Sequence, residues 1–255
     1  MEKVMPKMLK IDAHTHLGNC KTFGVRISED ELLKSMDDYH IDASIVQPHP
    51  GEDIPENIHD DIAALAEKYP GRIFGLASMN PHFDRKRYTK EIERCIRSLH
   101  FVGIKLHTFG HAISPISERA TMVFDLARDL NVPVMIHTGP GVPFSLPSLC
   151  ITKASKYPTV PIILAHSGAI TYVSEAYVAA HEYQNIFLET SWCAAHRIQW
   201  LITEIGPDRV MFGSDIPSNM PVEITKYDTI NLTAEESRLT RGKTAINVFN
   251  LKVKV

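Results

Sequence analysis

Short runs of apolar, β-prone residues recur along the chain at intervals of about 30 residues. Between them, apolar residues return every three or four positions, which is the spacing of one face of a helix. Eight strand-like runs can be read: KIDAHTH, ASIVQPH, RIFGLASMN, VGIKLH, VPVMIHTG, VPIILAHSG, NIFLETS and RVMFGSD. The pattern therefore predicts eight repeats of a strand followed by a helix.

The intervals between these runs predict helices with recognisable starts. Ser28 with Glu31, and Thr233 with Glu236, fit the capping box S/T-x-x-E, in which two side chains satisfy free backbone N–H groups. The second box begins a closing helix that runs through Asn247. The helical pattern is clearest over Glu29–Tyr39, Glu56–Tyr69, Asp84–Leu99, Glu118–Leu130 and Ala194–Ile205.

Eight strand–helix units in a chain of 255 residues match the size of a (β/α)8 TIM barrel. Near-continuous apolar runs such as VPIILA suit parallel strands that are covered on both faces. An open doubly wound sheet is the alternative, but no GxGxxG motif follows the first run. We therefore predict one α/β domain over residues 1–255, folded as a (β/α)8 barrel.

Composition and charge narrow the class of protein. With 22% charged residues and a net charge of -3, nothing indicates a nucleic-acid partner, and no apolar run is long enough to span a membrane. The N-terminal segment MEKVMPKMLKID lacks the apolar stretch of a secretory signal, so a cytoplasmic location is expected. Cys20, Cys95, Cys150 and Cys193 show no CxxC spacing, which argues against a disulfide framework and a thiolate zinc site.

Several metal-binding residue types stand at the carboxyl ends of predicted strands, where barrel enzymes carry out their chemistry. His14 and His16 are two residues apart, so in a strand both imidazoles point to one face, although such a pair can also be two unrelated histidines. Barrel closure puts Asp215 beside them. Imidazoles and a carboxylate suit zinc, with manganese, iron or nickel as alternatives. The other strand ends carry Lys105, His107, His137 and His166.

The motifs DAHTHLG, GIKLH, IHTG, LAHSG, GPDRVMFGSDIP and TAINVFNL occur in this order. Together they resemble the amidohydrolase superfamily, in the branch of aminocarboxymuconate-semialdehyde decarboxylase and related small metal-dependent hydrolases. The resemblance spans essentially the whole chain. It implies that His14, His16, His137 and Asp215 bind one or two divalent metal ions, and that His166 binds a second metal or orients the attacking water. A homodimer is expected from the resemblance alone.

Lys105 leaves three interpretations open. In binuclear members of the superfamily, a lysine on the fourth strand is carboxylated and bridges two metals, whereas the decarboxylase branch generally uses one metal and no such lysine. Carboxylation requires an uncharged amine, so the pKa of Lys105 would have to be lowered by burial or by the metals. Lys105 could instead hold a substrate carboxylate, or form a structural pair with Glu189 on the seventh strand.

This set of residues predicts a metal-dependent hydrolase acting on a small, carboxylated or cyclic ester, lactone or amide. A bound dication brings the pKa of a coordinated water toward about 7. Asp215 would then take the proton of that water and pass it to the leaving group, and His166 would stabilise the oxyanion that forms on the substrate. Lys105 is the third residue of the predicted catalytic set. Candidates for binding the small-molecule substrate are Lys105, His107, Arg26 and Trp192.

Three other functions remain alternatives. The main one is a metal-dependent, non-oxidative decarboxylase that protonates an unsaturated or aromatic acid and releases CO2. A TatD-like nuclease expects a glutamate where this chain has Lys105, and a non-catalytic barrel would hold a fully ligated structural metal. Cys193 suggests a thiol nucleophile, but nothing near it in sequence supplies a histidine partner.

Overall fold

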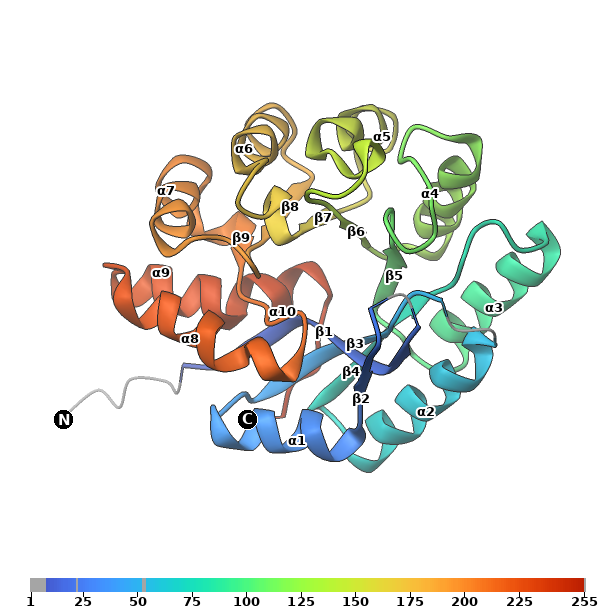
Figure 1. Cartoon of the computed structure of the whole chain (residues 1–255), viewed down its shortest axis with the longest axis horizontal. Coiled ribbons are helices and arrows are strands. Elements are labelled where there is room, and N and C mark those ends of the chain that lie inside the picture. Colours follow the sequence, from blue (N-terminus) through green and yellow to red (C-terminus); the bar gives the residue numbers. More distant parts are fainter. Residues whose placement is uncertain (1–7, 22, 52–53, 255) are drawn as a thin grey trace.

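The computed structural model describes residues 8–21, 23–51 and 54–254, and it confirms the predicted (β/α)8 barrel. Eight parallel strands follow one another around the sheet, and a short ninth strand, β2, pairs antiparallel with β1. Figure 1 shows the helices arranged around these strands. The strands are β1 Ile11–Cys20, β2 Val25–Ile27, β3 Ala43–Pro48, β4 Ile73–Ser78, β5 Gly103–Leu106, β6 Val134–His137, β7 Ile162–Ala165, β8 Ile186–Glu189 and β9 Val210–Met211.

Hydrogen bonds between the first and the last strand segments close the barrel. Thr15 forms a parallel bridge with Asp215, whose backbone N–H donates to the carbonyl of His14 at 2.7 Å. The Asp12 side chain reinforces this seam, because it accepts from the backbone N–H of Ser214 at 2.9 Å and from the Ser214 hydroxyl at 2.6 Å. Closure therefore sets Asp215 next to the two histidines of β1.

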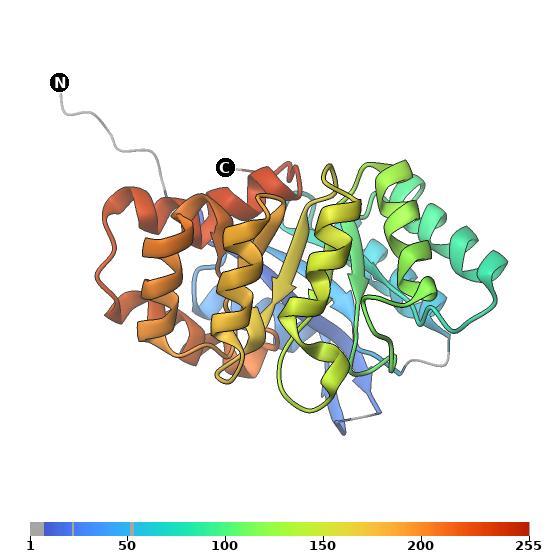
Figure 2. The same cartoon turned by 90° about the horizontal axis from the view of Figure 1, so that it is seen from above.

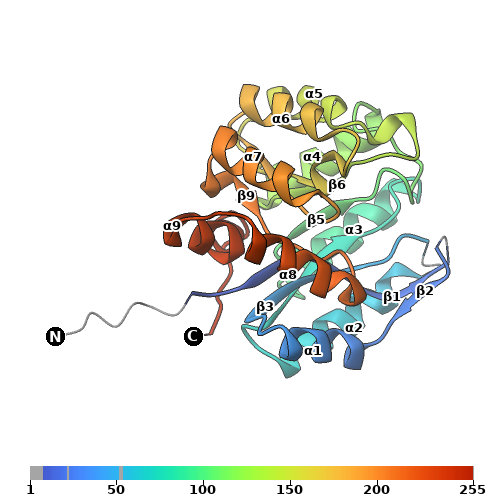
Figure 3. The same ribbon diagram turned by 60° about the vertical axis from the view of Figure 1, so that its left-hand side comes forward.

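The helices form the outer layer, which Figure 3 shows from α1 and α2 round to α8 and α9. Both predicted capping boxes are formed, at Ser28 before α1 and at Thr233 before α9. The closing helix is divided, because a π-helical turn over Leu239–Lys243 separates α9 from α10. The helices are α1 Glu29–Asp38, α2 Pro55–Lys68, α3 Arg85–Arg97, α4 Glu118–Leu130, α5 Ile151–Lys156, α6 Val173–Glu182, α7 Ala195–Ile205, α8 Met220–Thr229, α9 Ala234–Arg238 and α10 Thr244–Val248.

None of the helices among the described residues combines the length and apolar character that crossing a membrane requires.

The barrel interior is apolar at its lower levels, where Ile45 and Met135 pack in one cluster with Phe249 from the C-terminal segment. Side chains two residues further along a strand share the same face. That face therefore carries Gln47 on β3 and His137 on β6, and the interior becomes polar toward the carboxyl ends of the strands.

The first strand departs from a regular barrel strand in two ways. Its register with β3 shifts between Asp12 and Thr15, an irregularity of the kind that redirects side chains beside active sites. Beyond the barrel rim it continues to Cys20 and pairs with β2, although the strand-like run in the sequence ends at His16. Figure 2 shows this hairpin projecting from the end of the molecule opposite the two termini.

Candidate metal centre

Three side chains from the first and last strand segments converge at the carboxyl end of the barrel. The Asp215 oxygen Oδ1 lies 3.4 Å from His14 Nε2 and 3.4 Å from His16 Nε2. Both imidazoles are buried, whereas the Asp215 side chain keeps 20% of its exposure. The three groups therefore form the floor of an opening to solvent.

The second ring nitrogen of each histidine fixes its tautomer. His14 Nδ1 lies 2.7 Å from a Glu189 oxygen, and His16 Nδ1 lies 3.0 Å from the Pro48 carbonyl. Both partners can only accept hydrogen bonds when Glu189 is ionised, so each Nδ1 donates and each Nε2 of a neutral ring carries a lone pair. Burial, followed by the charge of Lys105, holds the pKa of His14 well below its usual range, which keeps that ring neutral.

The resulting arrangement fits a divalent cation. Two nitrogen lone pairs and a carboxylate oxygen converge here, and the donors that meet the two nitrogens are the side chains of Lys105, 2.9 Å from His14 Nε2, and Gln47, 3.1 Å from His16 Nε2. Metal bonds of about 2.1 Å in tetrahedral geometry place neighbouring ligand atoms about 3.4 Å apart, which is the separation observed between Asp215 and each histidine. His14, His16 and Asp215 are thus the residues that could hold such an ion.

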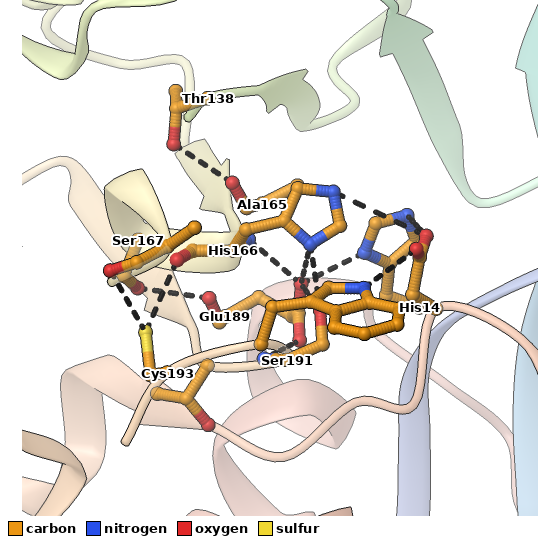
Figure 4. A network of polar contacts seen from close by, with 12 residues as sticks. His14, Thr138, Ala165, His166, Ser167, Glu189, Ser191 and Cys193 are labelled. Carbon is orange, nitrogen blue, oxygen red and sulfur yellow. Dashed lines mark hydrogen bonds and ion pairs between the residues drawn. The ribbon is translucent and has the colours of Figure 1, made fainter. Parts of the chain in front are cut away.

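Glu189, at the end of β8, organises this floor from behind (Figure 4). The side chain is fully buried and accepts four hydrogen bonds: from His14 Nδ1 at 2.7 Å, the His166 backbone at 3.0 Å, the Ser191 backbone at 2.6 Å and the Ser191 hydroxyl at 2.9 Å. Gly213 makes room for it, since a Cβ at that position would lie 2.5 Å from a Glu189 oxygen. Sequence reasoning offered Glu189 only as a partner of Lys105.

His166 follows β7 and faces the same floor. Its Nδ1 lies 2.8 Å from the Ser191 hydroxyl, which in turn donates to Glu189, so Nδ1 donates and Nε2 is left with a lone pair. That Nε2 lies 4.0 Å from Asp215 Oδ1. Burial lowers the pKa of His166 to about 4, so the ring is neutral near pH 7. Glu189 therefore orients His14 directly and His166 through Ser191.

Lys105 makes a contact that was not among its predicted ones, and His137 ends β6, where the sequence placed it. The Lys105 amine bonds to His14 Nε2 at 2.9 Å and not to Glu189, and burial lowers its pKa to about 8 against the opposing charges of Asp215 and Glu189. An ion bound to His14 Nε2 would take up that lone pair, so the Lys105 amine would have to move away from it. His137 stacks on His107 with ring centres 4.5 Å apart, and its ring centre lies 4.9 Å from that of His166; its role as a ligand stays a prediction.

Trp192 holds the second oxygen of Asp215. Its indole N–H donates to Asp215 Oδ2 at 2.8 Å, which leaves Oδ1 for the histidines. The Trp192 backbone has φ of 65°, a left-handed conformation that is strained for a bulky residue, and its N–H donates to buried Glu223 at 2.9 Å. Glu223 also accepts from Asn219 at 2.9 Å. Neither Glu223 nor Asn219 was singled out in the sequence.

A cavity of about 620 Å³ opens above this floor, and its walls include His16, His107, His166, Trp192 and Asp215. Of the four residues predicted to bind the substrate, His107 and Trp192 line it, whereas Lys105 lies beneath it.

The prediction that Arg26 binds the substrate is not supported by the structure. Neighbouring residues of a strand point to opposite faces, so Val25 lines the cavity and Arg26 lines a separate groove beside α2. Cys193 is no nucleophile either, because its thiol is buried against the His166 carbonyl at 3.1 Å and burial raises its pKa.

The barrel and the histidine and aspartate side chains gathered at the carboxyl ends of its parallel strands are together typical of an enzyme of the amidohydrolase fold. The sequence model of the Amidohydrolase family matches residues 11–251, so the chain belongs to this family. A gamma-resorcylate decarboxylase of Rhodococcus jostii is 26% identical over an alignment that covers 88% of each protein.

Two solved structures share the fold. The 5-carboxyvanillate decarboxylase of Sphingomonas paucimobilis superposes with a TM-score of 0.78 at 15% identity, covering 96% of this chain and 100% of that one. The 5-carboxyvanillate decarboxylase of Novosphingobium aromaticivorans, solved with manganese, gives a TM-score of 0.75 at 19% identity, covering 95% and 96%. The prediction of a hydrolase is wrong: these relatives are decarboxylases, which agrees with the alternative drawn from the sequence.

Proposed function

We propose that this protein is a metal-dependent, non-oxidative decarboxylase of an aromatic carboxylic acid. The observation that carries the proposal is the meeting of His14 Nε2, His16 Nε2 and Asp215 Oδ1 at 3.4 Å, with both Nδ1 atoms already engaged. The curated relative at 26% identity, a gamma-resorcylate decarboxylase, supports the reaction type.

We assign the ion to His14, His16 and Asp215. A divalent cation bound there would polarise a substrate oxygen and neutralise charge that develops on the ring. The nitrogen and oxygen donors suit both zinc and manganese. Manganese is the first ion to test, because it is present in a structural neighbour that decarboxylates 5-carboxyvanillate.

The remaining chemistry falls to the side chains of this chain. Decarboxylation breaks the bond between the ring and the carboxyl carbon, releases CO2 and leaves an electron pair on the ring carbon, which takes a proton. Asp215 is ionised at rest, so we assign it the uptake of one proton from water by way of His166 Nε2, which lies 4.0 Å away, and the delivery of that proton to the ring carbon. Glu189 keeps His14 and His166 in the tautomers that this arrangement needs.

The test is to load the purified protein with Mn2+ or Zn2+, add 2,6-dihydroxybenzoate, and quantify CO2 and the ring product. The proposal predicts equal amounts of the two and, in heavy water, one deuterium at the vacated ring carbon. Asp215→Ala is the inactive control. Metal-loaded protein that releases no CO2 from this acid or from 5-carboxyvanillate would contradict the proposal.

A further inference from the structure

The cavity above the floor is polar at its base and apolar at its mouth. His16 and Asp215 lie at the base, where the side chains keep 4% and 20% of their exposure. At the mouth, four apolar side chains from three separate segments surround the opening, and we call them the apolar rim: Phe23, Val25, Ile170 and Trp192. These residues are among the most exposed large apolar side chains of the described chain, with Ile170 at 75%.

The rim is built into the fold. Phe23 stands on the β1–β2 hairpin and stacks on Phe109 with ring centres 5.4 Å apart, so the hairpin side of the rim has a second aromatic ring behind it. On the other side, Trp192 is fixed by its bonds to Asp215 and Glu223. An apolar surface exposed in this way, and continuous with a cavity, is typical of a ligand-binding site.

The charge of the cavity limits what the substrate can carry. Among the described residues that line it, none is a lysine or an arginine, and Arg26 faces the opposite side of β2. The ionised group that the lining does contain is Asp215, and the cation that we assign to it lies at the base, where the reacting carboxylate binds. A second carboxylate near the mouth would therefore lose hydration without gaining a cationic partner.

We propose that the substrate is an aromatic acid with a single carboxylate and an apolar substituent that packs against the apolar rim. The reacting carboxyl group must lie at the floor, because the groups able to move a proton are there, so the rest of the molecule extends toward the rim. The cavity volume of about 620 Å³ is within the range for drug-sized ligands and exceeds what a single ring fills. This inference rests on the proposed decarboxylase function.

The first test compares matched substrates on the metal-loaded wild-type protein. 2,6-Dihydroxybenzoate is the parent acid, and its derivatives carry a methyl, a butyl or a carboxylate group at the ring position opposite the reacting carboxyl. We expect the KM to fall about fourfold for each methylene group that the rim covers, and to rise for the dicarboxylate. CO2 release with equal KM for the butyl and carboxylate derivatives would overturn the inference and leave the decarboxylase function standing.

The second test uses variants of the rim. In Ile170→Ala and Phe23→Ala, the ratio of kcat/KM between the butyl derivative and the parent acid should fall by about tenfold toward one. Ile116→Ala is the matched control, because Ile116 is 56% exposed but does not line the cavity. The molar mass of the same proteins is measured by light scattering. If the rim variants keep the wild-type ratio of kcat/KM and change from dimer to monomer, the inference is overturned, because the rim would then contact a second copy of the chain.

Discussion

In the described part of the chain, two buried histidines are hydrogen-bonded to a glutamate, one inside the barrel and one between α2 and α3. In the barrel, His14 Nδ1 lies 2.7 Å from Glu189; between the helices, His59 Nδ1 lies 2.8 Å from Glu91. Each pair belongs to a group of three potential ligands, and Cys95 is the third member between the helices. By residue type, burial and distance, the two pairs look alike.

The other ring nitrogen separates them. His59 Nε2 accepts the backbone N–H of Ser78 at 3.0 Å, and Arg94 makes two bonds of 2.8 Å to the carboxylate of Glu91. This pair therefore ties two helices to the end of β4 and has no lone pair free for an ion. His14 Nε2 instead faces Asp215 in the barrel interior, and its hydrogen-bond partner is the side-chain amine of Lys105 at 2.9 Å, which can rotate away, and not a backbone group. A buried His–Glu pair is thus a candidate for chemistry only where its second nitrogen is not held by a backbone group of the fold.

The largest expected difference between the pairs is in activity. In Glu189→Gln, an amide replaces a carboxylate that accepts four hydrogen bonds, so its NH2 group meets donors and the orientations of His14 and His166 are lost. We expect kcat/KM to fall about 100-fold and metal affinity to fall with it. Glu91→Gln is the matched control in steady-state kinetics and should keep wild-type kcat/KM. A Glu189→Gln protein as active as Glu91→Gln would contradict the proposed difference between the two histidine–glutamate pairs.

The second difference is in stability. Burial alone would raise the pKa of Glu91, but hydrogen bonds from His59 and Arg94 outweigh it and lower the pKa to about 2. Since this value lies below the ordinary 4.5, the stabilisation is present above pH 4.5 and is lost as the pH falls toward about 2. Glu91→Gln should lower the free energy of unfolding by about 2 kcal/mol at pH 7. Urea denaturation at pH 7 and pH 3 checks this, and an equal loss at both would contradict it.

A smaller effect on activity is expected for a change at Trp192, which belongs to the site inside the barrel. Trp192→Phe keeps an aromatic ring but removes the N–H that holds Asp215 Oδ2. We expect kcat at saturating substrate to fall about tenfold, the value of one hydrogen bond to a charged group, with the unfolding midpoint nearly unchanged. An unaltered kcat would show that Asp215 does not depend on this contact.

The smallest effect is expected at Arg26. Its side chain is exposed and lines the groove beside α2, so Arg26→Ala should leave KM within about twofold of wild type. The measurement is the KM for 2,6-dihydroxybenzoate. A tenfold rise would restore the original prediction that Arg26 binds the substrate.

Much of the fold and part of the site followed from the sequence, because periodicity and barrel topology are enough to place strand ends. The rule that parallel strands end at one face of a barrel is enough to predict that Asp215 lies beside His14 and His16. The helix boundaries also agreed closely, since Ser28 and Thr233 carry recognisable capping boxes.

What the sequence did not predict depends on contacts between side chains. No spacing rule gives the direction of the Trp192 indole, or the second hydrogen bond that separates His14 from His59. The first strand-like run ends at His16, so the sequence did not predict the pairing of β1 with β2 or the opposite orientations of Val25 and Arg26. One signal was available: Glu189 ends an otherwise apolar strand, and a carboxylate at that level must be met by several donors.

The most direct test of the metal centre is metal content per chain, measured by elemental analysis on protein loaded with Mn2+ and passed through a desalting column. The wild type and Glu91→Gln should each retain at least one ion per chain, and Asp215→Ala should retain almost none while remaining folded by circular dichroism. An Asp215→Ala protein that keeps the wild-type metal content would contradict the assignment of the ion to His14, His16 and Asp215.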